Sequence, residues 1–293
     1  MRVITTALLL LCFPILCLAQ TGRNSRERGE QVMKALAAAH PGRIESVQKR
    51  GNDWAVLIRG DWFCYAEGRL LPEGLADKAG EFSPQPFYNY LRELPPWQTP
   101  SAEAAERFRS MADARNKNPP KRSSHFFDAL WRARSRDESY ERVKSIRFLG
   151  HSIMVHYSIL EELALVEEQI LAEAKTNSSV RAWIANIKEL AGWNWRSIAD
   201  TQSRSFHAYG TAIDVIPKSA EGKESYWLWT SRTKSDWWNI PYDQRLHPPA
   251  AVIKAFESRG FIWGGKWLYF DTMHFEYRPE ILILSEMPPL TTR

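Results

Sequence analysis

Apolar positions in this chain follow two patterns, one typical of helices and one typical of short strands. Residues 24–40 place Val32, Leu36 and several alanines on one side and charges on the other, which predicts an amphipathic helix. The segments "RIESVQ" and "WAVLIRGDWFCYA" follow, and the second contains the turn sequence Arg59-Gly60-Asp61 between two apolar runs, which predicts a hairpin. Together these elements predict a small α+β unit near the N-terminus.

Helical spacing returns after a connection that is rich in proline. Residues 82–100 contain five prolines and are expected to be extended, and residues 115–124, "RNKNPPKRSS", are expected to form a linker or surface loop. Apolar residues then recur at helical spacing in two segments that we interpret as the core faces of helices: Ile159, Leu163, Val166 and Ile170, then Val180, Trp183, Ile184 and Ile187.

The beginning of the chain has the pattern of a secretory signal peptide. A single positive charge precedes an almost wholly apolar run, residues 3–18, which is followed by the small residue Ala19. The run is short for a membrane span, and no later segment is long and apolar enough to be one. We therefore expect residues 1–19 to be removed and the protein to be exported, to the periplasm or the extracellular space, without stable membrane insertion. Lipid modification of Cys17 is the alternative, although Leu16 is bulky for such a site.

Net charge and cysteine content argue against two features, nucleic-acid binding and an intramolecular disulfide. The formal net charge of +5 is mildly basic, and no stripe of aromatic and basic residues or nucleic-acid motif accompanies it, so nucleic acid is not an expected partner. Only Cys64 of the three cysteines lies beyond the signal segment, which excludes an intramolecular disulfide in the mature protein.

Candidate chemistry is concentrated in residues 203–216, "SRSFHAYGTAIDVI". Gly210 and the β-branched residues after it predict a turn that enters a strand, so His207 would lie before the turn and Asp214 inside the strand. An aspartate among buried aliphatic side chains is costly unless it is paired, and a metal ion is one such partner.

A second stretch, residues 260–280, adds the remaining groups that such a site needs. It contains Asp271, His274 and Glu276 in "GFIWGGKWLYFDTMHFEYRPE". Catalytic zinc takes three protein ligands and leaves one position open, and a nearby carboxylate can then accept a proton from water. These residue types suffice for metal-assisted hydrolysis. A metal-free hydrolase that uses Ser205 is the rival interpretation, although no nucleophile-elbow pattern surrounds that serine.

The two stretches resemble the signatures of one family of zinc peptidases. "SFHAYGTAID" resembles the Ser-x-His-x-x-Gly-x-Ala-x-Asp signature of the VanY-type D-alanyl-D-alanine carboxypeptidases, VanX-type dipeptidases and phage L-alanyl-D-glutamate endopeptidases. "GFIWGGKW" followed by "FDTMHF" resembles the second signature of the endopeptidases. The resemblance implies zinc bound by His207, Asp214 and His274, with Asp271 as general base, and peptidoglycan stem peptides as substrates cut at a terminal D-Ala or an internal L-Ala–D-Glu bond.

The resemblance leaves the roles of several neighbours open. Glu276 stands where the endopeptidases commonly have glutamine, and on a strand it would point to the same side as His274, so strand parity favours Glu276 as the base while the motif favours Asp271. We follow the motif and expect Glu276 to hold a ligand or a substrate amine.

Other side chains beside the two motifs are candidates for contacting the substrate. Arg204 and Arg196 are candidates for stabilising the oxyanion. Ser205 is expected to bond the substrate or orient a ligand. Tyr209, Trp263 and Trp267 are candidates for walls of the cleft, with core packing as the alternative for Trp263.

The expected fold is α+β, with helices packed on a small antiparallel sheet that carries the zinc site, as in the hedgehog and D-Ala-D-Ala peptidase group. Residues 20–120 would form the N-terminal α+β region, whose role the sequence leaves open, and residues 121–293 the catalytic domain. A zinc-binding module that recognises wall peptides without cutting them is a further alternative, against which the retention of Asp271 argues.

Overall fold

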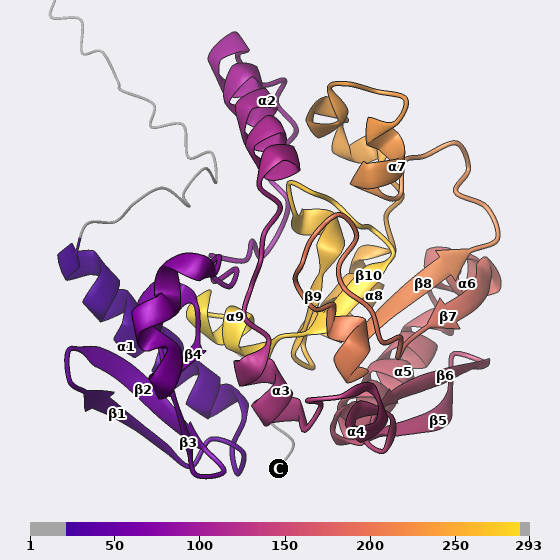
Figure 1. The fold of residues 1–293 in the computed structure, drawn as a ribbon. Coiled ribbons are helices and arrows are strands. Elements are labelled where there is room, and N and C mark those ends of the chain that lie inside the picture. The colour runs from indigo at the N-terminus through magenta and orange to yellow at the C-terminus, as the bar shows by residue number, and fades with distance from the viewer. Residues whose placement is uncertain (1–21, 288–293) are drawn as a thin grey trace, which may run out of the picture.

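The computed structural model of the protein describes residues 22–287 and is shown in Figure 1. The predicted signal segment, residues 1–19, lies outside the described residues. The helices are α1 (Gly22–Ala39), α2 (Ala102–Lys117), α3 (His125–Trp131), α4 (Arg136–Tyr140), α5 (Leu160–Ala174), α6 (Ser178–Ala185), α7 (Trp227–Ser231), α8 (Ala250–Glu257) and α9 (Pro279–Leu284). The strands are β1 (Ser46–Arg50), β2 (Asp53–Ile58), β3 (Asp61–Cys64), β4 (Leu71–Pro72), β5 (Val143–Phe148), β6 (His151–His156), β7 (Ile187–Ala191), β8 (Ala212–Pro217), β9 (Phe261–Trp263) and β10 (His274–Tyr277). The predicted α+β class is confirmed.

The N-terminal unit forms as its apolar pattern predicts. Strands β1 to β4 make an antiparallel sheet in chain order, and the predicted hairpin between β2 and β3 is present. Helix α1 packs on this sheet through Val32, Met33 and Leu36, each of which has no exposed surface. The predicted connection over residues 82–100 is irregular. The predicted linker is shorter than expected, because residues 115–117 are the last turn of α2.

A second antiparallel sheet, in the order β7-β8-β10-β9, positions the candidate chemistry. Its two central strands alternate apolar and polar residues, so Ile213 and Phe275 are paired on one face while Asp214 and His274 are paired on the other. The apolar face is buried against α5 and α8, where the ring of Phe275 stacks on Phe256 at a centroid distance of 3.9 Å. Burial of one face therefore directs the carboxylate and the imidazole to the opposite face.

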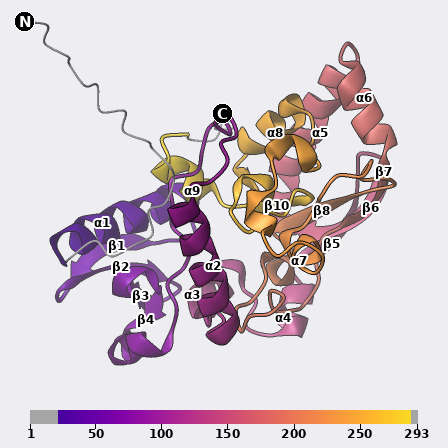
Figure 2. The same ribbon diagram turned by 90° about the horizontal axis from the view of Figure 1, so that it is seen from above.

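The N-terminal unit shares a hydrophobic core with the region beyond residue 120. Figures 1 and 2 show α9, close to the C-terminus, beside α1. Ile281 and Leu282 of α9 belong to the same buried cluster as the apolar face of α1, and the cluster also includes side chains of α3. In the described residues, no helix is long and apolar enough to cross a membrane.

Candidate metal centre

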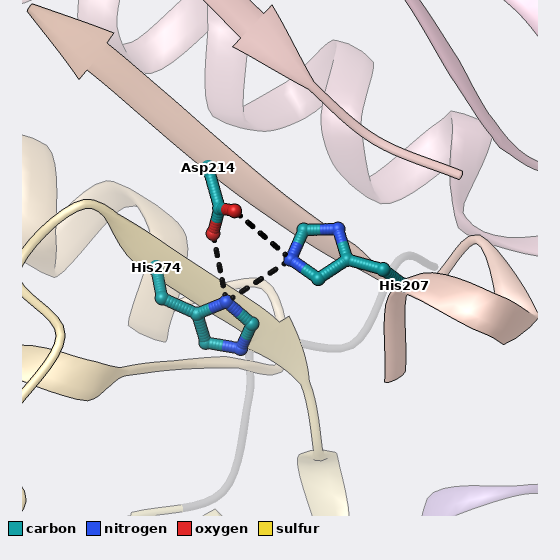
Figure 3. A group of neighbouring side chains, drawn as sticks. All are labelled: His207, Asp214 and His274. Atoms are coloured by element: carbon teal, nitrogen blue, oxygen red, sulfur yellow. Dashed lines mark hydrogen bonds and ion pairs between the residues drawn. The ribbon is translucent and has the colours of Figure 1, made fainter. Parts of the chain in front are cut away.

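Three candidate ligands from two separate stretches of the sequence converge at the polar face of the second sheet. Figure 3 shows His207, Asp214 and His274 facing one another, and their ligand atoms all lie within 4.8 Å of one another. Asp214 comes from β8, and His274 is its cross-strand partner on β10. His207 comes from the short 3-10 helix η4 (Phe206–Tyr209), which directly precedes β8. The structure thus brings together the three residues that the motifs indicate.

A glycine fixes the turn that separates His207 from Asp214. Gly210 ends η4 with a φ of 71°, a left-handed conformation that other residues adopt at a cost. A β-carbon at this position would lie 2.8 Å from the backbone nitrogen of His156, so the close packing also requires glycine. Ser205 begins the turn, and its Oγ accepts a hydrogen bond from the backbone N–H of His207 at 3.3 Å. Ser205 is buried and therefore orients His207 locally.

The hydrogen-bond partners of the two imidazoles determine which nitrogens can bind a cation. His207 Nδ1 donates to the carbonyl oxygen of Gly192 at 2.7 Å, and His274 Nε2 donates to Glu276 Oε2 at 3.1 Å. In the neutral rings, His207 Nε2 and His274 Nδ1 then carry lone pairs, yet these two atoms lie only 3.3 Å apart. They also face Asp214, at 3.2 Å and 2.8 Å. Either a proton on His274 Nδ1, which lies 2.8 Å from Asp214 Oδ1, or a bound cation is therefore needed between these acceptors.

The electrostatics of the cluster favour a positive charge. Burial by itself would lower the pKa of His274, but hydrogen bonds with Asp214 and Glu276 raise it to about 10. Burial would raise the pKa of Asp214, whereas the two histidines lower it. Two nitrogens and one carboxylate are also the donor set typical of catalytic zinc. The residues present therefore fit a zinc ion, and a partner behind each imidazole is the usual arrangement at such sites.

The two acids that compete for the role of base lie in different surroundings. Asp271 forms an isolated bridge with Tyr226 just before the turn that leads into β10, and its Oδ1 accepts from the N–H of Met273 at 3.3 Å. Burial, together with the charge of Asp214, raises the pKa of Asp271 to about 7. Glu276 lies on the same side of the strand as His274, as parity predicts, but both its oxygens are engaged, one by His274 and the other by Arg278 at 3.3 Å.

A cavity of about 370 Å³ opens beside the cluster and includes His207 and Asp214 in its lining. Residues of β6 and β7 form part of its wall, and Arg196 lies in the same lining. Trp267 also lies close to the cluster, with its ring centroid 5.5 Å from that of His274. Trp263 has 1% of its surface exposed and belongs to the core instead.

Arg204 and Tyr209 meet at a different acid, Asp128 in α3. Arg204 Nη1 lies 2.6 Å from Asp128 Oδ1, and the hydroxyl of Tyr209 donates to the same oxygen at 3.1 Å. Tyr209 has 1% of its surface exposed, so its side chain fills the core that joins α3 to η4. Sequence reasoning missed Asp128 and the Gly192 carbonyl, because neither lies in a motif and each is distant in the chain from the residue it holds.

Comparison with known proteins gives matches to two segments of the chain. Residues 32–87 match a family model described as a domain of unknown function. No curated protein and no solved structure matches the chain. Residues 199–277, which contain the three candidate ligands and both acids, match the family model described as D-alanyl-D-alanine carboxypeptidase, and this match suggests a peptidase of the zinc metallopeptidase type.

Proposed function

We propose that this protein is an exported zinc peptidase that hydrolyses peptidoglycan stem peptides. The observation that carries the proposal is the convergence of His207 Nε2, His274 Nδ1 and the carboxylate of Asp214 within 4.8 Å, with both imidazoles held from behind. The match of residues 199–277 to the carboxypeptidase family supports the choice of a peptide substrate.

His207, Asp214 and His274 would hold the zinc ion. When bound, zinc would polarise the scissile carbonyl and make a water molecule more acidic. The protein's contribution is to keep the ligand atoms in place before the substrate arrives, since the Gly192 carbonyl and Glu276 fix the orientation of the two rings.

Asp271 is the proposed general base. One carboxylate oxygen is anchored by the N–H of Met273, which leaves the other free to accept a proton from the attacking water and to pass it to the nitrogen of the leaving amine. A pKa of about 7, raised by burial and by Asp214, suits a group that both accepts and donates a proton near neutral pH. Glu276 is less suited to this role, because His274 and Arg278 occupy its oxygens.

Arg196 is the better of the two arginines for contact with the substrate. It lies in the lining of the cavity that contains His207 and Asp214, where a guanidinium can bind a substrate carboxylate or the developing oxyanion. Arg204 is engaged by Asp128 and by the carbonyl oxygen of Ala133 at 3.0 Å. We assign Trp267, beside His274, to the wall of the substrate site.

Digestion of purified sacculi tests the activity. We expect the protein to release fragments whose masses identify either loss of a terminal D-Ala or cleavage between L-Ala and D-Glu, and we expect a chelator to abolish release until zinc is restored. Release that ignores chelators would support the rival serine hydrolase. Zinc-loaded protein that binds the peptides and never cuts them would support the recognition module.

Export is a separate part of the proposal. The signal pattern at residues 1–19 predicts that the mature chain begins at Gln20. N-terminal sequencing of secreted protein tests this, and secreted material that begins at Met1 would contradict it.

A further inference from the structure

A continuous line of buried ionisable groups connects the candidate metal centre to the N-terminal unit. It begins at His274, whose Nε2 donates to Glu276 Oε2 at 3.1 Å. Glu276 Oε1 accepts from Arg278 Nη1 at 3.3 Å, and Arg278 Nε donates to Glu280. The last contact joins Glu280 Oε2 to His40 Nε2 at 3.5 Å. His40 directly follows α1, so the line starts at β10 and ends in the N-terminal unit.

Burial makes the geometry of this line exacting. Arg278 and Glu280 have 1% and 0% of their surface exposed, and His40 has 4%. Rings of Phe127 and Phe206 lie 5.4 Å and 4.7 Å from the Arg278 guanidinium, so water is largely replaced by aromatic carbon around it. A buried charge is stable only when its partner is in place. Loss of one group in the line is therefore expected to displace its neighbour.

Arg278 is the shared member on which two carboxylates depend. Burial would raise the pKa of Glu280, but Arg278 and His40 lower it to about 2, so Glu280 is ionised and pairs with the guanidinium of Arg278. The same guanidinium donates to Glu276 through Nη1 at 3.3 Å, so one rigid planar group holds both carboxylates. The position of Glu276 in turn sets the orientation of the His274 ring.

We propose that the N-terminal unit completes the metal centre: His40, Glu280 and Arg278 act as positioning residues that hold Glu276, and through it His274, in the geometry that binds zinc. This inference rests on the metal centre of the proposed function, and it assigns a role to a unit that matches only a domain of unknown function.

The test compares two buried histidines that share a neighbour. His40 and His156 both pack edge-on against the ring of Trp131, at centroid distances of 5.3 Å and 5.4 Å, but only His40 contacts Glu280. His40→Phe keeps an aromatic ring and removes the nitrogen that lies 3.5 Å from Glu280, whereas His40→Gln keeps a side-chain N–H in its place. His156→Phe is the matched control. Each full-length protein is titrated with zinc against a competing chelator, and the visible absorption of its cobalt(II) form is recorded, because that spectrum reports ligand geometry.

We expect His40→Phe to weaken zinc binding by about threefold to tenfold and to shift the cobalt spectrum. This loss is smaller than the roughly 10- to 100-fold that follows removal of a group hydrogen-bonded directly to a metal ligand, because His40 acts on His274 only through other residues. His40→Gln should restore both, and His156→Phe should stay within about twofold of the wild type even if it loses as much thermal stability. Arg278→Lys cannot serve both carboxylates with one ammonium, so it should weaken zinc binding by about tenfold. If His40→Phe does not fold, zinc binding by Arg278→Lys tests whether these buried groups position Glu276 and His274.

Two results would overturn the inference: wild-type zinc affinity and an unchanged cobalt spectrum in folded His40→Phe and Arg278→Lys, or an equal loss in the His156→Phe control. Wild-type protein that binds no zinc would refute the metal centre and this inference together. Wild-type protein that binds zinc and cuts no wall peptide would refute the peptidase alone, and the comparison of variants would still decide the role of the line.

Discussion

Substituting the two competing acids separately tests which of them moves the proton. Asp271→Asn keeps the size of the side chain and an oxygen that can accept from the N–H of Met273, but the amide cannot accept a proton from water. In the wild type, His274 Nε2 lies 3.1 Å from the carboxylate of Glu276. Glu276→Gln keeps an oxygen that can accept this hydrogen bond but loses the negative charge that faces Arg278.

The expected magnitudes differ because the two acids do different things. Loss of the general base should lower turnover by about two to four decades, which corresponds to about 3–5 kcal/mol of transition-state stabilisation. Glu276→Gln should lower turnover by less than about tenfold once zinc is saturating, because its effect falls on ligand orientation and hence on zinc affinity.

The assay is peptide hydrolysis under saturating zinc, with the zinc content of every sample measured in parallel, since a lost metal would imitate a lost base. The loss in Asp271→Asn should appear in kcat, because the missing interaction belongs to the transition state. If Glu276→Gln is the inactive enzyme and Asp271→Asn works normally, the assignment of the base is wrong.

Three further substitutions probe the surroundings of the site. Burial lowers the pKa of His156 to about 4, below the 6.5 expected in the unfolded chain, so the free energy of unfolding should fall by up to about 3 kcal/mol as the pH drops from 6.5 to 4. Urea unfolding at several pH values should show a weaker pH dependence for His156→Gln, and the same pH dependence in both proteins would refute this. Gly210→Ala should lose about 1–3 kcal/mol, because it places a β-carbon at a φ of 71° against a backbone nitrogen, and an unchanged unfolding midpoint would contradict the packing argument. Ser205→Ala removes only the hydroxyl that accepts a hydrogen bond from the backbone N–H of His207, so activity should fall by less than about tenfold. An inactive Ser205→Ala variant, together with wild-type activity that is insensitive to chelators, would support the serine hydrolase.

Local patterns predicted the elements and the motif residues well. The spacing of apolar residues located α1, α5 and α6, and the glycine after His207 correctly separated the turn from the strand that carries Asp214. The assignment of Ile187 to the second of these helices was wrong, because α6 ends at Ala185 and Ile187 begins β7. Strand parity correctly placed Glu276 beside His274, but the alternation of side chains along one strand cannot predict that Arg278 engages the same carboxylate.

Contacts between distant segments could not be predicted from those patterns. Arg204 lies next to the first motif, which made it a candidate for the oxyanion, but Asp128 holds it from 76 residues away in the sequence. The buried contact between Glu280 and His40 likewise joins two segments that are far apart in the sequence. A pairing of this kind depends on how the segments pack, and no periodicity or turn signal encodes it.

Metal content is the most direct test of the central claim. Protein purified without added zinc should contain one zinc ion per chain, and His274→Ala should lose it, because Asp214 and His207 alone leave the ion with two protein ligands. Unfolding curves of both proteins serve as the control for the fold. Folded His274→Ala that keeps its full zinc content would contradict the account.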